Sequence, residues 1–320
     1  MVNSIRLASL ALSVAVAGAA AYAFSPRPLP PFSKTEVRAD RLHINGIAKA
    51  GQRLVAVGEA GHILFSDDQG INWNPAQVVP QAGSTLTQVN FSNELQGLAV
   101  GHDGVIVKTD DGGANWRQVR FDEQFSDPLL YVSATDPKNI FAVGSFGKFL
   151  HSSDGGAKWA SPASPPDIAD AHINALIPGA DGRMLLVGEA GMVQRSHDGA
   201  SQWEALTLPY KGSMFGGLAL DADTWLVYGM RGNVFRTEDF GNSWTRIDTG
   251  LPTSFFGGLR LQDGRIVLVG QGGAMLVSSD DGKSFKIHRV GGRASLTSLI
   301  EVAPGQLLVG GETGVERVAL

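Results

Sequence analysis

The 320-residue sequence contains no cysteine. Disulfide bonds and a lipid-modified N-terminal cysteine are therefore excluded, and the fold has to depend on its buried core. Charged residues are few, at 18%, and acidic residues outnumber basic ones, so that the formal net charge is −5. A nucleic-acid partner is disfavoured, because nucleic acids are bound by clustered basic surfaces.

One uncharged apolar segment is present, at the N-terminus. Arg6 precedes the run from Leu7 to Ala21, and Ala21-Tyr22-Ala23 has the small-x-small pattern of a cleavage site. We expect residues 1–23 to be a secretory signal peptide. An uncleaved anchor is the alternative, because residues 7–24 have about the minimum length that crosses a bilayer. Export without disulfides favours the periplasm, with tethering to the inner membrane if the segment is retained.

A short pattern, Ser/Thr-x-Asp-x-Gly-x-x-Trp, occurs six times along the chain. We call it the aspartate box. Its aromatic residues recur at intervals of about 41 to 44 residues, which indicates one repeated supersecondary unit. The box positions are Asp68 and Trp73, Asp111 and Trp116, Asp154 and Trp159, Asp198 and Trp203, Asp239 and Trp244, and Asp280 and Phe285.

Each repeat also contains four short apolar strands separated by turn residues. This pattern predicts an all-β propeller built from four-stranded antiparallel blades. A Gly-x-x-Gly turn follows the second strand of each repeat and occurs seven times, from Gly58–Gly61 to Gly311–Gly314, so we expect seven blades. The last repeat ends after its third strand. We expect the segment Phe32 to Val37 to supply the missing outer strand and close the ring.

These features divide the chain into three parts. Residues 1–23 are the expected signal peptide, residues 24–31 form a proline-rich extended spacer, and residues 32–320 form the propeller.

The chemistry of the aspartate box predicts a structural role. Its carboxylate is suited to accept backbone N–H groups of the turn, its Ser/Thr hydroxyl to bond the same loop, and its glycine to adopt the left-handed conformation. The tryptophan is expected to cover an apolar gap. Two departures from the pattern, Ala200 for glycine and Phe285 for tryptophan, are of the kind that a packing motif tolerates.

The combination of Val-Gly-x-x-Gly turns and aspartate boxes over about residues 40–320 resembles the BNR/Asp-box propellers, and among them the photosystem II assembly and stability factor family and its bacterial relatives. This resemblance implies an exported, non-enzymatic propeller that binds and helps to assemble a membrane protein complex. An accessory role for an inner-membrane transporter is the corresponding possibility outside photosynthetic organisms, and it rests on analogy of fold.

An enzyme is the competing hypothesis, because sialidases carry the same box. The sequence has no Arg-Ile-Pro or Arg-Leu-Pro motif, and only four tyrosines to supply a nucleophile, one of them Tyr22 in the expected signal. A glycoside hydrolase with two carboxylates remains an alternative, with Glu59 and Glu312 as candidates on adjoining blades one and seven. A carbohydrate-binding propeller without turnover is a third possibility.

No nucleophile elbow, P-loop or zinc-ligand spacing occurs, and we expect no metal and no cofactor. The His-Ile-Asn strings at His43 and His172 belong to blades one and four. These blades lie far apart in a ring of seven, so one metal ion is not expected to bind both.

Blades five and six differ from the others in their first strands, which read Met-Phe-Gly-Gly-Leu and Phe-Phe-Gly-Gly-Leu. One interpretation is that the phenylalanines fill the core and the glycines permit close packing. The other is that aromatic and arginine side chains form a docking surface, because these residue types are enriched in interface hot spots. The predicted partner-binding residues are Tyr210, Phe215, Arg231, Phe255, Phe256, Arg260 and Arg293.

Overall fold

The computed structural model describes residues 2–23, 37–122, 126–134, 136–161, 168, 170–290 and 292–320, with the backbone alone for residues 2–9 and Arg289. The chain divides into two units, Met1–Val37 and Arg38–Leu320. The first unit contains the helix α1 (Val2–Ala23), whose side chains are exposed from Leu10 onwards. None of the helices in the described ranges is sufficiently long and apolar to cross a membrane.

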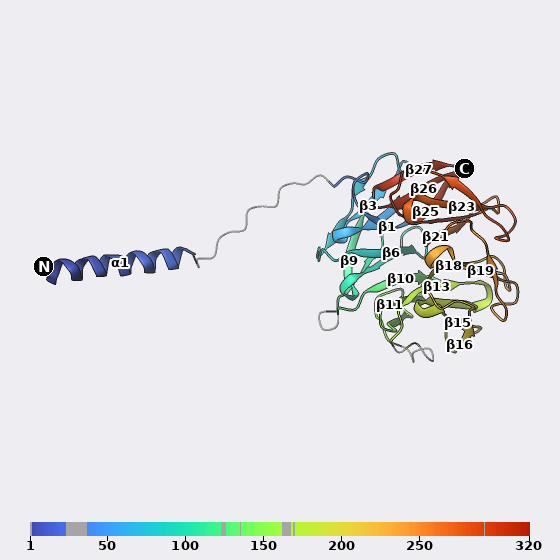
Figure 1. The fold of residues 1–320 in the computed structure, drawn as a ribbon, viewed down its shortest axis with the longest axis horizontal. Helices are drawn as coiled ribbons and strands as arrows, with labels where there is room; N and C mark the ends of the chain where they lie inside the picture. The colour runs from blue at the N-terminus through green and yellow to red at the C-terminus, as the bar shows by residue number, and fades with distance from the viewer. Residues whose placement is uncertain are drawn as a thin grey trace. The chain divides into compact units, whose positions relative to one another are not determined.

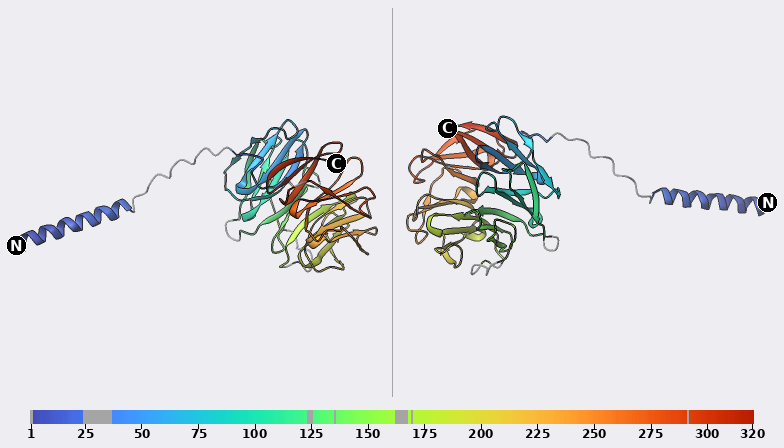
Figure 2. Two further views of the ribbon diagram at one scale, coloured as in Figure 1. Left: turned by 45° about the horizontal axis from the view of Figure 1, so that its top comes forward. Right: turned by 180° about the vertical axis from the view of Figure 1, so that it is seen from behind.

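The second unit is a ring of seven sheets, antiparallel apart from one added strand, in the part of the chain that the structure describes (Figure 1). The first strand of each sheet contacts the first strands of both neighbouring sheets, and the first sheet contacts the last in the same way. Figure 2 shows the first blade, in blue, beside the last, in red. The predicted all-β, seven-bladed propeller is therefore confirmed.

In each blade the antiparallel strands follow chain order from the axis outwards. The inner strands are β1 (Ile44–Ala50), β6 (Leu86–Phe91), β10 (Leu129–Ala134), β13 (Ile173–Pro178), β17 (Met214–Ala219), β21 (Phe255–Arg260) and β25 (Leu296–Ala303). The second strands are β2 (Arg53–Gly58), β7 (Gly97–Gly101), β11 (Ile140–Gly144), β14 (Met184–Gly188), β18 (Trp225–Gly229), β22 (Ile266–Gly270) and β26 (Gln306–Gly311).

The third strands are β3 (Ile63–Ser66), β8 (Ile106–Thr109), β12 (Phe149–Ser152), β15 (Met192–Ser196), β19 (Val234–Thr237), β23 (Ala274–Ser278) and β27 (Gly314–Ala319). The outer strands are β4 (Asn74–Pro75), β9 (Asn115–Arg120), β16 (Glu204–Thr207), β20 (Thr245–Ile247) and β24 (Lys286–Arg289).

Three blades depart from the four-stranded plan. Blade two gains a fifth strand, β5 (Gln77–Val79), which pairs parallel to β9 as the chain leaves blade one. In blade three, a single bridge between His151 and Ala160 stands in the place of an outer strand. Blade seven has three strands within the described residues.

The core lies between neighbouring blades. Apart from Arg53 and Gln306 at their first positions, the residues of the second strands are buried, because these strands are covered on both sides. Between blades four and five, for example, Leu185 and Val187 pack with Trp225 and Phe235. Burial of each such side chain contributes about 1.5–3 kcal/mol, so the apolar second strands hold the ring together.

Successive turns of each blade alternate between two ends of the molecule. The Gly-x-x-Gly turns lie at the end where chains pass from blade to blade, as the bond from Glu59 N to His43 O (3.1 Å) shows. We call this end the hairpin face. The aspartate boxes lie at the other end beside the turns between first and second strands, since Gly112 N donates to Leu95 O (2.9 Å). We call that end the box face.

The two glycines of the Gly-x-x-Gly turn serve different purposes. Gly61 adopts the left-handed conformation (φ +69°), as the tight turn requires. Gly58 has extended backbone, but a Cβ atom there would lie 1.9 Å from His43 O. The first glycine therefore permits the preceding inter-blade loop to cross the turn closely, and Ala60 between them is also left-handed (φ 52°).

The ring is closed between blades seven and one by direct contact of their inner strands. Thr297 Oγ1 donates a hydrogen bond of 2.6 Å to Ile44 O. Val315 N of β27 also donates to Ala39 O (3.1 Å), which ties the start of the second unit to the last strand. Of the segment predicted to complete blade seven, residues 32–36 lie outside the described residues, so that prediction stays a prediction.

Every inner strand begins with a β-bulge. The register with the second strand shifts at the second residue of all seven inner strands, so that this residue has no partner in the ladder. We call these the bulge residues: Asn45, Thr87, Leu130, Asn174, Phe215, Phe256 and Thr297.

Candidate functional site

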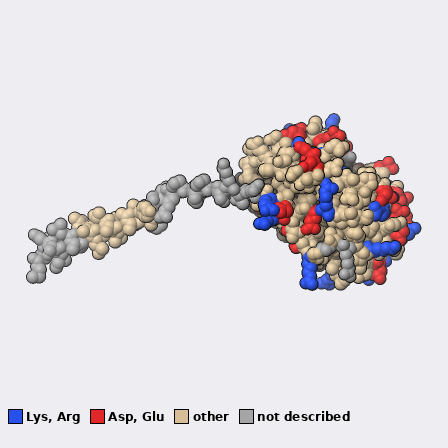
Figure 3. All heavy atoms as spheres, turned by 90° about the horizontal axis from the view of Figure 1, so that it is seen from above, with Lys and Arg blue, Asp and Glu red and all other residues tan. Residues whose placement is uncertain are grey.

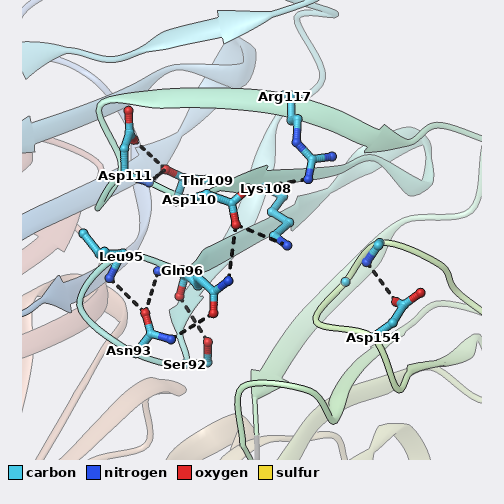
Figure 4. Close-up of polar contacts among 12 residues, drawn as sticks. Ser92, Asn93, Leu95, Gln96, Lys108, Thr109, Asp110, Asp111, Arg117 and Asp154 are labelled. Carbon is cyan, nitrogen blue, oxygen red and sulfur yellow. Dashed lines mark hydrogen bonds and ion pairs between the residues drawn. The ribbon is translucent and has the colours of Figure 1, made fainter.

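The aspartate boxes form closed hydrogen-bond networks, and Figure 4 shows the one in blade two. Asp111 Oδ1 accepts bonds from Ala114 N (3.1 Å), Asn115 N (3.0 Å) and the Thr109 hydroxyl (2.8 Å). The same hydroxyl accepts from Gly113 N (3.0 Å). The carboxylate and the hydroxyl thus bond the turn as the sequence predicts.

The boxes of the other blades repeat this arrangement, and their bonds favour the ionised carboxylate. The backbone N–H of Asn72 and the side chains around it lower the pKa of Asp68 to about 2. The hydroxyl of Ser243 is the main cause that lowers the pKa of Asp239 to about 2, and Ser284 acts in the same way on Asp280. A carboxylate held ionised by its own turn is poorly suited to act as a general acid.

The box aromatics pack at the edges of the blades. Trp116 is 2% exposed, and its Nε1 donates to Gly113 O (2.9 Å). Trp159 makes the equivalent bond to Gly156 O (3.2 Å). The buried Nε1 of Trp244, by contrast, has no acceptor among the described residues. The remaining box aromatics, Trp73, Trp203 and Phe285, are partly buried.

The two candidate catalytic carboxylates are both bonded to the backbone of their own blades. Glu59 Oε1 accepts from His43 N (3.1 Å), and Glu312 Oε2 accepts from Ser295 N (3.0 Å). The bond from Ser295 lowers the pKa of Glu312, which is opposite to the shift that a glycosidase acid needs. Each glutamate therefore holds the inter-blade loop against its Gly-x-x-Gly turn.

His172 also has local partners. Its Nδ1 accepts from Phe146 N (3.2 Å), its Nε2 lies 3.6 Å from Glu189 Oε2, and the Phe146 ring packs edge-on against it. Within the described ranges, no group of three or more His, Asp or Glu side chains is arranged to hold a metal ion.

The arginines predicted to share a docking surface lie on two faces. Arg231, at the turn tip of blade five, and Arg293, between blades six and seven, are exposed on the hairpin face. Arg260 is at the end of β21 on the box face, where it donates to Leu220 O (2.6 Å) and pairs with Asp281 (3.3 Å). The two ends of an inner strand lie on opposite faces, so Arg260 is not part of the hairpin surface.

The aromatic residues of the predicted surface also separate. Phe255 is fully buried between blades five and six and offers no surface to a partner. Phe215 and Phe256 are partly exposed, and their ring centroids lie 5.5 Å apart. Tyr210 is half-buried on the hairpin face, with its hydroxyl 3.5 Å from Met230 O. Sequence reasoning could not distinguish Phe255 from Phe256, because the bulge resets the alternation of the strand.

Phe215 and Phe256 line a cavity of about 200 Å³ on the axis of the ring. Its lining comes from the second to fourth residues of the inner strands of all seven blades, together with Tyr228. The inner strands begin on the hairpin face, so the bulge residues lie at the end of the cavity nearest that face. No Asp, Glu, Lys or Arg is among the described residues that line it.

The cavity was not singled out by the sequence analysis, although a signal for it exists. The seven bulge residues occupy equivalent positions in the repeat, and they would have emerged from an alignment of the first strand of each blade. Tyr131 and Tyr228 bring two phenol groups to the same cavity, and burial raises the pKa of both.

On the face of the propeller shown in Figure 3, charges of both signs are interspersed, and neither sign covers that face. Such a surface lacks the continuous basic field of a nucleic-acid-binding protein.

Solved structures with the same fold include photosynthetic assembly factors. A structure of "YCF48 bound to D1 peptide" has a TM-score of 0.71 and 17% identity, covering 92% of this chain and 98% of that one. YCF48 from Cyanidioschyzon merolae has a TM-score of 0.69 and 18% identity, covering 88% and 95%. The WD40 propeller domain of Doa1 has a TM-score of 0.70 at 13% identity, covering 88% and 93%. At these identities the similarity shows the fold alone.

A comparison with curated proteins gave no match. The family model described as "Photosynthesis system II assembly factor YCF48" matches residues 56–166 and 109–254, which overlap and together cover more than half of the chain. The matched residues run from the second strand of blade one through blade five and include five of the six aspartate boxes. This chain belongs to the photosynthesis system II assembly factor YCF48 family.

Proposed function

We propose that this protein is an exported, non-enzymatic propeller that binds a segment of a membrane protein and helps to assemble the complex to which that protein belongs. The observation that carries the proposal is membership of the assembly factor family. One solved relative of the same fold is described as bound to a D1 peptide, which shows that this architecture can present a peptide-binding surface.

The hairpin face is the proposed binding surface. On the box face, the boxes use their carboxylates and hydroxyls within their own turns, and Arg260 is bonded between blades. The hairpin face carries the end of the axial cavity, the exposed Arg231 and Arg293, and Phe146, whose side chain is 59% exposed at the turn tip of blade three. Exposed aromatic and arginine side chains are typical of interface hot spots.

Export and location are part of the proposal. A signal peptide over residues 1–23 followed by a spacer over residues 24–31 would place the propeller in the periplasm. The partner would then be an integral protein of the inner membrane, such as a transporter complex. A non-enzymatic role is supported by the hydrogen bonds that Glu59 and Glu312 accept from backbone N–H groups of their own blades. These bonds favour a structural role for both glutamates over a role as the acid and base of a glycoside hydrolase.

Affinity capture tests this function. The full chain with a C-terminal tag is recovered from an envelope fraction in mild detergent, and the captured proteins are identified by mass spectrometry. We expect enrichment of one membrane protein complex, and loss of that enrichment with Arg231→Glu. Arg246→Glu is the matched control, because Arg246 is also exposed but lies on the outer strand β20.

Recovery of no membrane protein, or recovery that Arg231→Glu and Arg246→Glu reduce equally, would contradict the proposal. Turnover of a glycan by the purified chain, abolished by Glu59→Gln or Glu312→Gln, would favour the enzyme hypothesis instead.

A further inference from the structure

The bulge residues connect each blade to the next where their side chains are polar. Asn45 Nδ2 donates to Leu86 O (2.8 Å), which is the first residue of the next inner strand. Thr87 Oγ1 donates to Leu129 O in the same way (2.8 Å). The equivalent bonds from Asn174 to Met214 O (2.8 Å) and from Thr297 to Ile44 O (2.6 Å) complete the set.

Three blades lack this connection. The bulge residues of blades three, five and six are Leu130, Phe215 and Phe256, whose side chains have no hydrogen-bond donor. Phe215 and Phe256 pack against each other with an interplanar angle of 47°, and both stay partly exposed to the cavity. At these positions the propeller lacks the hydrogen bond that joins the inner strands of neighbouring blades. Instead, Phe215 and Phe256 form an apolar wall on one side of the axial cavity.

One glycine from each of the two Gly-Gly pairs makes room for a tyrosine beside this wall. A Cβ atom on Gly216 would lie 2.5 Å from the Tyr228 hydroxyl, and one on Gly258 would lie 2.7 Å from the Tyr228 ring. Tyr228 stands where the second strands of most blades carry valine. Neither it nor Tyr131 makes a hydrogen bond from its hydroxyl to any residue in the described ranges. The cavity thus combines an apolar wall with two phenol groups that are available to a ligand.

The size of the cavity favours a single side chain. Sites for small organic ligands occupy about 300–1,000 Å³. The axial cavity, at about 200 Å³, is smaller than that range. Aromatic rings associate with centroids about 4.5–7 Å apart, and the Phe215–Phe256 pair presents surfaces against which a third ring can pack.

The loops around this side of the cavity are basic. Lys211, Arg231 and Arg293 are exposed on the hairpin face from blade five to blade seven, and none of them has an ion pair among the described residues. Arg231 N lies 3.4 Å from Ser254 Oγ, two residues before Phe256, so its backbone stands directly beside the inner strand of blade six. The acidic residues on the same side of the hairpin face include Asp248, which accepts a bond from Gly250 N (3.0 Å), and Glu312, which accepts one from Ser295 N (3.0 Å).

We propose that the axial cavity binds one aromatic side chain of a partner peptide, with acidic residues flanking that side chain. The bound aromatic ring packs against Phe215 and Phe256. The hydroxyl groups of Tyr131 and Tyr228 are available to form hydrogen bonds with a polar group on that ring. The basic loops bind the carboxylates of the flanking acidic residues. This inference deepens the proposed function and rests on it, because it names the feature of the membrane protein segment that is bound.

Two variants test the cavity without removing its architecture. Phe215→Asn and Phe256→Thr introduce bulge residues that other blades already carry, so the propeller is expected to keep its fold and its melting temperature. The matched control is Ile71→Asn, which removes an apolar side chain that is 71% exposed on the box face and introduces the residue found at the same position of box five.

The probes are two fluorescein-labelled peptides, Gly-Asp-Asp-Tyr-Asp-Asp-Gly and the same peptide with serine in place of tyrosine. By fluorescence anisotropy, we expect the tyrosine peptide to bind the full chain about tenfold or more tightly than the serine peptide. Phe215→Asn and Phe256→Thr should each weaken binding of the tyrosine peptide by a similar factor, and Ile71→Asn should leave it unchanged.

Equal binding of the two peptides, no binding of either, or an equal loss in Ile71→Asn would overturn the inference. The capture experiment separates this failure from failure of the proposed function. If the membrane complex is still recovered with Phe215→Asn, the protein has its function but the cavity is not the site. If wild type recovers no complex, the function itself fails.

Discussion

Each box aspartate is the residue on which its turn depends. Two neighbouring aspartates of box two, Asp110 and Asp111, allow this role to be separated from an effect of surface charge, because both are exposed. Figure 4 shows that their contacts differ. Asp111 accepts two backbone N–H groups, whereas Asp110 pairs with Lys108 (3.3 Å) and Arg117 (3.5 Å). The two adjacent aspartates therefore contribute to stability in different ways, Asp111 through hydrogen bonds to its turn and Asp110 through surface ion pairs.

We expect Asp111→Ala to lower the free energy of unfolding by about 1–3 kcal/mol, because two backbone donors lose their acceptor. Asp110→Ala should lower it by less than about 1 kcal/mol, as for other surface ion pairs. Urea denaturation followed by tryptophan fluorescence measures both values. Equal losses for the two variants would show that charge, and not the turn bonds, determines the contribution of the box.

At the scale of strands, the glycines of the Phe-Gly-Gly-Leu sequences are explained by a side chain from another strand. Gly216 of β17 and Gly258 of β21 accommodate the Tyr228 ring, which comes from β18. The sequence interpretation assigned these glycines to close packing near the axis, and the structure shows which side chain occupies the space. Gly216 lies opposite Tyr228 in the ladder of blade five, whereas Gly258 meets the tyrosine ring only when blade six is placed beside blade five.

Gly216→Ala should therefore destabilise the protein by about 1–3 kcal/mol, since the added methyl group would overlap the Tyr228 hydroxyl. Tyr228→Val, which restores the residue of most other blades, should relieve this overlap. In the double variant, the cost of Gly216→Ala is expected to fall below about 1 kcal/mol in the same denaturation assay. Additive costs would indicate that the glycine is needed for its backbone and not for the tyrosine.

At the scale of the whole molecule, the ring is closed by the same bond that joins other blades. Thr297 donates to Ile44 O across the junction of blades seven and one, and Thr87 donates to Leu129 O across the junction of blades two and three. The closing junction joins the two ends of the propeller, yet its geometry matches that of an interior junction. The ring is thus continuous at its inner strands in the described part of the chain.

Thr297→Val and Thr87→Val should each lower the free energy of unfolding by about 0.5–1.5 kcal/mol, because each removes a partly buried hydrogen bond between two inner strands. Both variants should unfold in a single transition with an unchanged denaturant slope. A second transition in Thr297→Val alone would mean that the closing junction opens independently of the other junctions.

The sequence by itself determined the repeat, the number of blades and the bonding role of the boxes. Periodic strands and turn residues act locally, and a repeat of about 40 residues leaves few alternative folds. The family resemblance drawn from the same motifs was confirmed by the family model.

Only the tertiary structure decided which residues share a surface. Arg231 lies at a turn tip on the hairpin face, whereas Arg260 lies at the end of β21 on the box face. The two are on opposite faces because β21 runs from the hairpin face to the box face. Phe255 and Phe256 are adjacent, but a bulge turns one into the core and the other into the cavity. Faces, bulges and the axial cavity arise when seven sheets meet around one axis, and no single repeat contains the information that places them.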